Sequence, residues 1–324
     1  MAEAIVLREH GGPEALCLEP VEVGQPGPGE LRLRQTAVGV NFHDVYVRSG
    51  LYRTLALPGI PGIEAVGVVE AVGPGVGGFA PGDRVGYITS AYGAYASERL
   101  LPAEAALRLP DGLDDRLAAT VLLKGLTAEM LLHRVRRVRP GEWLLVHAAA
   151  GGVGQLLCRW ASRLGARVIG TAGGPEKAEV ARDAGCEEVI LYREEDFAER
   201  VREITGGRGV DAVYDSVGRD TFEGSLRCLA PLGHLVNFGQ SSGPVPPFEV
   251  SRLAARSNGL FRPVVFHYAA GREASDAMAA SLFEALADGV LRPEPGRVFP
   301  LAEAAAAHAE LESRRTAGPL VLVP

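Results

Sequence analysis

The chain has 324 residues, of which 47% are hydrophobic and 23% charged, an ordinary composition for a globular protein large enough for two domains. Its formal net charge of −7 argues against a basic surface for nucleic acid or anionic lipid. The N-terminus lacks a secretory signal pattern, and no apolar run approaches the roughly 20 residues of a membrane span, so we expect a cytoplasmic protein that binds neither nucleic acid nor membrane.

The part of the chain up to about residue 120 contains short strand-like runs separated by glycine and proline. The runs cover residues 4–7, 31–38, 65–72 and 84–88. Their spacing is too irregular for a sequence repeat, and turn residues separate them. The pattern favours a partly open β-barrel.

From about residue 117 the pattern changes to helices that alternate with strands. A helical periodicity covers residues 117–138 and ends before Pro140 and Gly141. Strands are then expected at residues 143–148, 167–171, 188–191, 210–216, 234–238 and 260–262, with helices between them, for example at 177–184 and 197–205. Parallel strands joined by helical crossovers predict a doubly wound sheet.

The end of the chain contains a predicted helix at residues 274–288 and a last strand at 320–323. We expect this lone strand to return to the β-rich part. The predicted organisation is a catalytic domain made of residues 1–124 and 265–324, into which residues 125–264 are inserted as a nucleotide-binding domain.

Residues 142–154 combine a buried strand with an abrupt turn of small residues, and an amphipathic run follows at 155–164. The spacing Ala148-x-x-Gly151-x-x-Gly154 is a variant of the dinucleotide-binding turn. Small residues let a pyrophosphate approach the backbone, and the N–H groups at the start of the helix attract the anion. The alternative to a nucleotide-binding role is a tight turn that serves only the packing of an α/β fold. The expected nucleotide contacts are Ala150, Gly151, Gly152, Val153 and Gly154.

The segment after the second strand of this sheet favours NADP over NAD. An NAD site places Asp or Glu at this strand end to hold the ribose hydroxyls, whereas residues 168–175 contain no acid. Gly173 lies in this segment, and Lys177 follows at the start of the next helix, where its ammonium can pair with a 2′-phosphate. The alternative is that Lys177 is a solvated helix residue. Lysine is rare in this chain, however, since Lys124 is the only other one among 33 Lys and Arg residues.

The four cysteines lie far apart in the sequence, at Cys17, Cys158, Cys186 and Cys228. The lack of a C-x-x-C pair argues against a redox dithiol and against a thiolate zinc site. We expect buried, reduced thiols.

Several segments give the chain a family resemblance. They are residues 39–52, 61–64, 124–127, 148–154, 214–218, 237–240 and 311–314. In them the chain resembles, essentially end to end, the medium-chain dehydrogenase/reductase superfamily and, within it, the zinc-free NADPH:quinone oxidoreductases (the ζ-crystallin-like group). The resemblance implies a GroES-like β-barrel domain, a Rossmann domain and a homodimer joined through the nucleotide-binding domain, for which the apolar segment 257–266 is a suitable sheet edge.

The residues at the metal positions of this superfamily argue against a metal. Zinc-containing relatives carry Cys where this chain has Asn41, and Gly-His-Glu where it has Gly62-Ile63-Glu64. Asn and Ile do not replace thiolate and imidazole ligands. Without a Lewis acid, we expect an acceptor already activated for hydride, such as a quinone or a conjugated enone.

The resemblance also implies a set of NADPH contacts. Lys177 and Tyr192 would bind the 2′-phosphate, and a helix start with Lys124 and Thr127 would face the nicotinamide and its phosphates. The alternatives are surface placement for Lys124 and a hydrogen bond to its own helix for Thr127. The segment with Phe238 and Gly239 would lie beside the nicotinamide ribose. Ser216, Gly218 and Ser241 are the other contacts expected near the cofactor cleft.

The expected reaction is NADPH-dependent reduction of a quinone by hydride transfer, with the protein supplying positioning and exclusion of water. The resemblance places Asn41, Tyr46 and Tyr52 at the substrate end, where a phenol can donate a hydrogen bond to a quinone oxygen without ionising. His43 titrates near neutrality and is a candidate proton donor. The alternatives are packing roles for the tyrosines and an incidental histidine. Alternative functions are an NADPH-dependent enone or alkenal reductase and a non-catalytic NADPH-binding protein.

Overall fold

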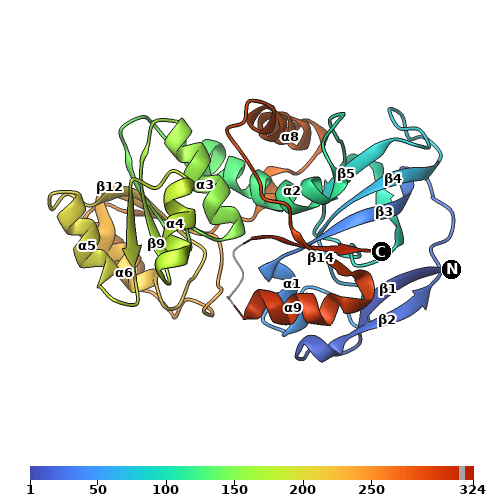
Figure 1. Cartoon of the computed structure of the whole chain (residues 1–324), viewed down its shortest axis with the longest axis horizontal. Helices are drawn as coiled ribbons and strands as arrows, with labels where there is room; N and C mark the ends of the chain where they lie inside the picture. Colours follow the sequence, from blue (N-terminus) through green and yellow to red (C-terminus); the bar gives the residue numbers. More distant parts are fainter. Residues whose placement is uncertain (314–317) are drawn as a thin grey trace. The chain divides into compact units, whose positions relative to one another are not determined.

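The computed structural model describes residues 1–313 and 318–324 and divides the chain into two compact units (Figure 1). The first unit contains residues 1–123, 269–283 and 293–324, and the second contains residues 124–268 and 284–292. Arg314, in the resemblance segment 311–314, lies outside the described residues.

The first unit is built on a mixed sheet with the strand order β14-β15-β3-β4-β5-β7, to which β6 is added by pairing with β3. Its strands are β3 (Glu30–Val40), β4 (Glu64–Val72), β5 (Arg84–Ile88), β6 (Glu98–Pro102), β7 (Ala106–Arg108), β14 (Arg297–Pro300) and β15 (Leu320–Val323). A separate antiparallel pair consists of β1 (Ala2–Leu7) and β2 (Leu16–Val21). Side chains from the sheet and this pair fill one apolar core that includes Ile5, Leu33 and Leu322.

The last strand of the chain belongs to this first unit. Leu320 of β15 pairs with Val40 of β3 in an antiparallel register. The prediction that the terminal strand returns to the β-rich part is therefore confirmed.

Two helices of the first unit are tied together by an ion pair whose arginine is buried and whose glutamate is partly exposed. Arg48, the last residue of α1 (Phe42–Arg48), donates from both terminal nitrogens to Glu312 at the end of α9 (Ala304–Glu312), at 2.8 and 2.9 Å. The Arg48 side chain is 3% exposed, so its charge depends on this partner. The other helical segments of this unit are η1 (Pro13–Ala15), η2 (Ala103–Ala105) and η5 (Leu301–Glu303), while α2 (Asp115–Glu129) and α8 (Arg272–Ala287) contribute residues to both units.

The second unit is a parallel sheet with the strand order β10-β9-β8-β11-β12-β13. Its strands are β8 (Trp143–Val146), β9 (Arg167–Ala172), β10 (Glu188–Leu191), β11 (Val210–Asp215), β12 (Leu229–Asn237) and β13 (Gly259–Phe261). The strand order reverses between β8 and β11, and in such sheets a ligand binds beyond the carboxyl ends of the strands at the reversal. The doubly wound sheet predicted from the alternating pattern is confirmed.

Most helices of the second unit connect consecutive strands of this sheet, while one lies before the first strand and one after the last (Figure 1). They are α3 (Gly152–Arg163), α4 (Pro175–Asp183), α5 (Phe197–Ile204), α6 (Phe222–Cys228) and α7 (Val265–Tyr268), with η3 (Met130–Val135) and η4 (Val250–Ala255). The helix expected over residues 117–138 ends as an α-helix at Glu129 and continues as the π-helical turn η3. Lys124 and Thr127 lie inside α2, so their expected placement at a helix start is wrong.

Three of the cysteines fit the sequence prediction and one does not. Cys158, Cys186 and Cys228 are buried, whereas Cys17 is exposed. Cys17 lies in β2, where Leu16 is buried and Cys17 points to the opposite face of the strand. Among the described residues, no helix is long and apolar enough to cross a membrane.

Candidate functional site

The turn between β8 and α3 is closed so tightly that only small residues fit. Ala148 has a positive φ of 51°, a conformation that usually requires glycine. A Cβ on Gly154 would lie 2.2 Å from the carbonyl oxygen of Ala148 and 2.8 Å from that of Ala149. Gly151 is the N-cap, and α3 begins at Gly152 with its first N–H groups facing out of the helix. The turn thus offers an anion a helix N-terminus to which Gly151, Gly152 and Gly154 add no side chain of their own.

Lys124 lies against the start of α3. A Cβ on Gly152 would be 2.9 Å from Lys124 Cδ and 3.1 Å from Cε, so the lysine stem passes directly over this glycine. Lys124 is 8% exposed, which is unusual for a lysine. Thr127 is one turn further along α2. The structure therefore brings a buried lysine and the helix N-terminus together, an arrangement suited to a pyrophosphate.

A second polar group lies at the carboxyl end of β9. Lys177 is in the first turn of α4, and Tyr192 directly follows β10, the neighbouring strand. A Cβ on Gly173 would be 3.0 Å from the Tyr192 hydroxyl, so this hydroxyl lies over the glycine. The amine and the phenol are the donors that a 2′-phosphate needs.

The loops after β11 and β12 pack against each other at the same edge of the sheet. Ser241 N donates to Ser216 O at 3.2 Å, and a Cβ on Gly239 would be 2.6 Å from that same oxygen. Gly218 has a positive φ of 89°, and Phe238 N donates to Asp215 O at 2.9 Å. The expected residues Ser216, Gly218, Phe238, Gly239 and Ser241 therefore form one pair of adjoining loops.

Asp215 shapes these loops and was missed at the sequence level. Its fully buried carboxylate accepts hydrogen bonds from Val217 N at 2.8 Å and Gly218 N at 3.0 Å, and the Thr221 hydroxyl donates to both of its oxygens. An acid at the end of a buried strand, followed three residues later by glycine, is the sequence signal for such a turn.

In the first unit, Asn41 and Glu64 form a buried pair. Asn41 Nδ2 donates to Glu64 Oε2 at 2.9 Å, and Leu123 N donates to Glu64 Oε1 at 2.6 Å. Both oxygens of Glu64 thus accept from protein donors. Among the described residues, no group of three or more His, Cys, Asp or Glu side chains is arranged to hold a metal ion.

Asn41 also starts the helix that carries the other candidate residues. Asp44 Oδ2 accepts from Asn41 N at 2.9 Å, which caps α1 directly after β3. His43 and Tyr46 project from this short helix. Tyr52 packs edge-on against both, with ring centroids 5.5 Å from His43 and 5.1 Å from Tyr46. The structure therefore brings three of the expected substrate residues into one cluster.

His43 differs from its sequence expectation. Burial lowers the pKa of His43 to about 4, because the interior disfavours the imidazolium. The expectation that this histidine titrates near neutrality is wrong, and at pH 7 it is neutral. A neutral imidazole has one N–H donor and one acceptor nitrogen.

Tyr92 joins this cluster and was not found from the sequence. Its hydroxyl is 3.2 Å from His43 Nε2 and also hydrogen-bonds Thr54 Oγ1. Tyr92 has a positive φ of 57°, which is rare for a bulky residue. The only sequence signal was its position in a Tyr-Gly-Ala-Tyr turn, which says nothing about His43.

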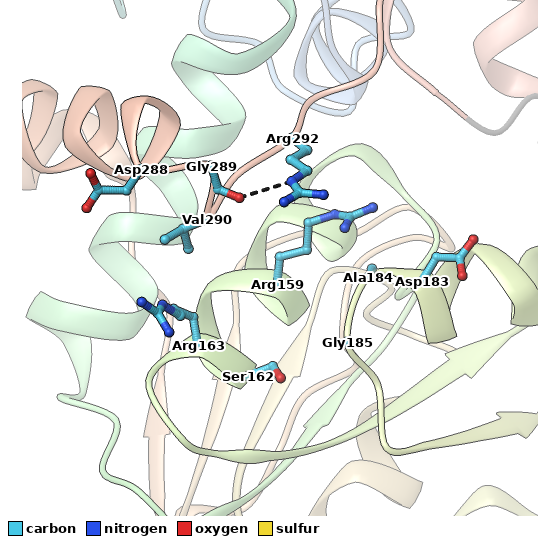
Figure 2. Close-up of a pocket in the computed structure, with 10 residues that line it drawn as sticks. All are labelled: Arg159, Ser162, Arg163, Asp183, Ala184, Gly185, Asp288, Gly289, Val290 and Arg292. Carbon is cyan, nitrogen blue, oxygen red and sulfur yellow. Dashed lines mark hydrogen bonds between the residues drawn. The ribbon is translucent and has the colours of Figure 1, made fainter.

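A pocket of about 520 Å³ lies elsewhere in the second unit (Figure 2). It is lined by the C-terminal ends of α3 and α4 and by the segment after α8, with Arg159, Arg163 and Arg292 around it. Arg292 Nε donates to Gly289 O at 3.2 Å. The glycine turn is at the other end of α3, so this pocket is separate from the expected nucleotide contacts. Arginines at helix C-termini complement the helix dipoles, and the pocket needs no ligand to explain them.

The comparisons with known proteins agree with both units. The Alcohol dehydrogenase GroES-like domain family matches residues 27–111, and the Zinc-binding dehydrogenase family matches residues 152–280. The chain is 47% identical to a quinone oxidoreductase of Pseudomonas aeruginosa, over all of both chains. It is also 47% identical to a 2-haloacrylate reductase of a Burkholderia species, over all of this chain and 99% of that one.

A solved structure shows the same fold. The structure of Escherichia coli quinone oxidoreductase complexed with NADPH superposes with a TM-score of 0.97 at 44% identity, covering 99% of this chain and all of the other. The chain belongs to the medium-chain dehydrogenase/reductase superfamily, in its quinone oxidoreductase group.

Proposed function

We propose that this protein is an NADPH:quinone oxidoreductase that works without a metal. The observation that supports the proposal is the arrangement of the second unit, with the glycine turn, the buried Lys124 over Gly152, the Tyr192 hydroxyl over Gly173, and Lys177 in the first turn of α4. When bound there, NADPH supplies a hydride for the acceptor. The relatives named quinone oxidoreductase, one of them solved with NADPH, support the same cofactor and acceptor.

We assign the pyrophosphate to the turn of Ala150, Gly151, Gly152, Val153 and Gly154, with Lys124 as its cation. Lys177 and Tyr192 would hold the 2′-phosphate, since the end of β9 carries no acid to repel it. Thr127 and the paired loops with Ser216, Gly218, Phe238, Gly239 and Ser241 would contact the nicotinamide end.

We assign substrate binding to the first unit, in the cluster around α1. Asn41, held by Glu64, and the phenols of Tyr46 and Tyr52 would hydrogen-bond the oxygens of the acceptor. His43 would donate the proton that the reduced acceptor takes up. These residues would position and protonate the acceptor, with His43 as a neutral imidazole.

A second candidate function is reduction of an activated carbon–carbon double bond. The specific support is the 47% identity to a 2-haloacrylate reductase over the whole chain. The hydride donor would be the same, and only the acceptor would differ.

A direct test is oxidation of NADPH and of NADH by the purified protein with 1,4-benzoquinone, 2-chloroacrylate and an alkenal as separate acceptors. Quinone turnover with NADPH alone supports the proposal. Turnover restricted to chloroacrylate or the alkenal would move the function to alkene reduction. NADPH binding without turnover of any acceptor would refute both reductase functions.

We also propose a homodimer that forms through β13, in the cytoplasm. β13 ends the strand order of the parallel sheet, and its Leu260 and Phe261 are each 37% exposed, so the strand offers an apolar edge for pairing with a second copy. Sedimentation should give a dimer for the native protein and a monomer for Leu260→Lys. A monomeric native protein would refute the dimer, and recovery of the protein in a membrane fraction would refute the location.

A further inference from the structure

Three side chains of the first unit form a continuous hydrogen-bond chain from an exposed position to His43. Thr54 is exposed, and its hydroxyl bonds the hydroxyl of Tyr92. Tyr92 is 6% exposed, and its hydroxyl is 3.2 Å from Nε2 of the partly buried His43. The rings of Tyr92 and His43 also pack together, with centroids 5.9 Å apart.

The backbone at Tyr92 is held in an unfavourable conformation by several contacts. Its positive φ of 57° is opposed by sterics, yet Arg99 Nη1 donates to Tyr92 O at 2.7 Å and Gly93 N donates to Ile60 O at 2.9 Å. A bulky residue keeps such a conformation only where its surroundings fix it, and such residues concentrate at functional sites. The strain is what directs the phenol toward His43 and Thr54.

We propose that Thr54 and Tyr92 form a proton relay that resupplies His43 during reduction of the acceptor. The inference rests on the proposed function, because it needs an acceptor whose oxygen becomes basic when it receives the hydride. Nothing in the sequence motifs or the relatives' names assigns a role to Tyr92 or Thr54.

The relay moves one proton at each link, leaves every group of the protein neutral, and leaves His43 as its other tautomer, with the proton on Nε2. The anionic oxygen of the reduced acceptor takes the N–H proton from the imidazole of His43. Nε2 of His43 takes the proton of the Tyr92 hydroxyl, Tyr92 takes that of Thr54, and Thr54 takes one from water. The overall change is one proton transferred from solvent to the acceptor, which with the hydride completes the two-electron reduction.

A concerted relay suits the chemistry of this cluster better than a charged acid. Burial lowers the pKa of His43 and raises the pKa of Tyr92, so both groups resist ionisation. A chain of groups that each donate and accept can pass a proton without any of them holding a net charge. Hydroxyl groups and a neutral imidazole have this dual capacity.

The test compares Tyr92→Phe and Thr54→Val with the native protein in single-turnover reduction of 1,4-benzoquinone by NADPH, in H₂O and in D₂O mixtures. We expect each variant to slow the reaction about tenfold or more, with binding of NADPH unchanged. The native protein should give a curved dependence of rate on deuterium fraction, since several protons move together, and Tyr92→Phe should make it linear.

Two controls separate the relay from a structural role. Thr54→Ser keeps the hydroxyl and should restore the native rate and curvature, which a packing role for the threonine methyl would not predict. Tyr268→Phe removes a phenol in the second unit and should change neither quantity. Since Thr54 is exposed, its variants test the relay even if Tyr92→Phe fails to fold.

Native rates and a native isotope dependence in both Tyr92→Phe and Thr54→Val would overturn the relay while leaving the proposed function intact. A native protein that reduces no quinone would instead refute the proposed function, and the relay with it.

Discussion

We assign the preference for NADPH over NADH to Lys177. It lies in the first turn of α4, four residues after Gly173, in a chain whose basic residues are otherwise nearly all arginine. Because lysine is rare among the basic residues of this chain, its presence at position 177 points to a role that a compact ammonium fulfils.

Replacement of Lys177 should therefore weaken NADPH binding selectively. Loss of a charged hydrogen bond to phosphate costs about 1.5–3 kcal/mol, so Lys177→Ala should raise the Kd for NADPH roughly tenfold to a hundredfold. The Kd for NADH should stay the same, because NADH lacks the phosphate. Fluorescence titration measures both. Arg182→Ala, on the exposed side of the same helix and paired with Glu179, is the matched control. An equal loss of affinity for both cofactors would contradict the role.

Several histidines whose pKa is lowered by burial make the protein sensitive to acid, and His43 and His308 are two of them. Burial lowers the pKa of His43 to about 4, and burial together with the neighbouring Arg48 guanidinium lowers that of His308 to about 3. In the unfolded chain the pKa is about 6.5, so below this pH the unfolded state takes up protons that the folded state does not. Stability is therefore complete above about pH 6.5 and falls as the pH drops from there toward the folded values, by up to about 1.4 kcal/mol per pH unit for each histidine.

His308→Gln should flatten this pH dependence. Glutamine can keep a hydrogen bond to the Tyr95 hydroxyl, which lies 2.9 Å from His308 Nε2, but it takes up no proton in the unfolded state. Denaturant unfolding between pH 7 and about pH 4 gives the slope. The exposed His267→Gln should leave the slope as in the native protein. An unchanged slope in His308→Gln would show that this histidine is not the source of the acid sensitivity.

At the scale of elements, local patterns predicted the second unit well and the first unit only in part. The alternation of apolar strands and amphipathic helices marks β8, α3 and β9 because each is recognisable within its own sequence. The strands β6, β7 and β14 are short and depend on pairing with distant partners, so their sequences show no alternation. The alanine-rich α9 has no polar and apolar faces for a periodicity to reveal.

Some residues of the candidate site could likewise be predicted from the sequence, and others could not. The nucleotide contacts follow from a strand–turn–helix motif, in which the residues that meet are close in sequence. The link between His43, Thr54 and Tyr92 joins three loops or helix ends separated by up to 49 residues, and a strained backbone directs it. The lowered pKa of His43 depends on burial among these side chains, which the sequence does not display.

Gly154 provides a test of the glycine turn as an element. A Cβ there would lie 2.2 Å from a backbone oxygen that cannot move without opening the turn, so Gly154→Ala should displace the start of α3 from β8. We expect NADPH affinity to fall about tenfold or more and stability to fall by about 1–3 kcal/mol, as for other overpacked sites. Gly77→Ala, where a Cβ would meet nothing within 4 Å, is the control. Unchanged cofactor affinity in Gly154→Ala would contradict the assignment of the turn to the pyrophosphate.

At the scale of the whole molecule, the two units divide the proposed reaction between them. The second unit carries every residue assigned to NADPH, and the first carries every residue assigned to the acceptor and its proton. Each unit has its own sheet and its own apolar core, so the proposed cofactor contacts and the proposed acceptor contacts can be altered separately. Variants of Lys177 should change cofactor binding alone, and variants of Tyr92 or Thr54 should change the chemical step alone.

The most direct measurement of the central claim is anaerobic single-turnover oxidation of NADPH by 1,4-benzoquinone, with NADPH that carries deuterium at the transferred C4 position as the comparison. The account predicts that one hydroquinone forms for each NADPH consumed, and that deuterium slows the reaction because the C4–H bond breaks during transfer. No consumption of NADPH with quinone, or consumption at the same rate with both forms of NADPH and without hydroquinone formation, would contradict it.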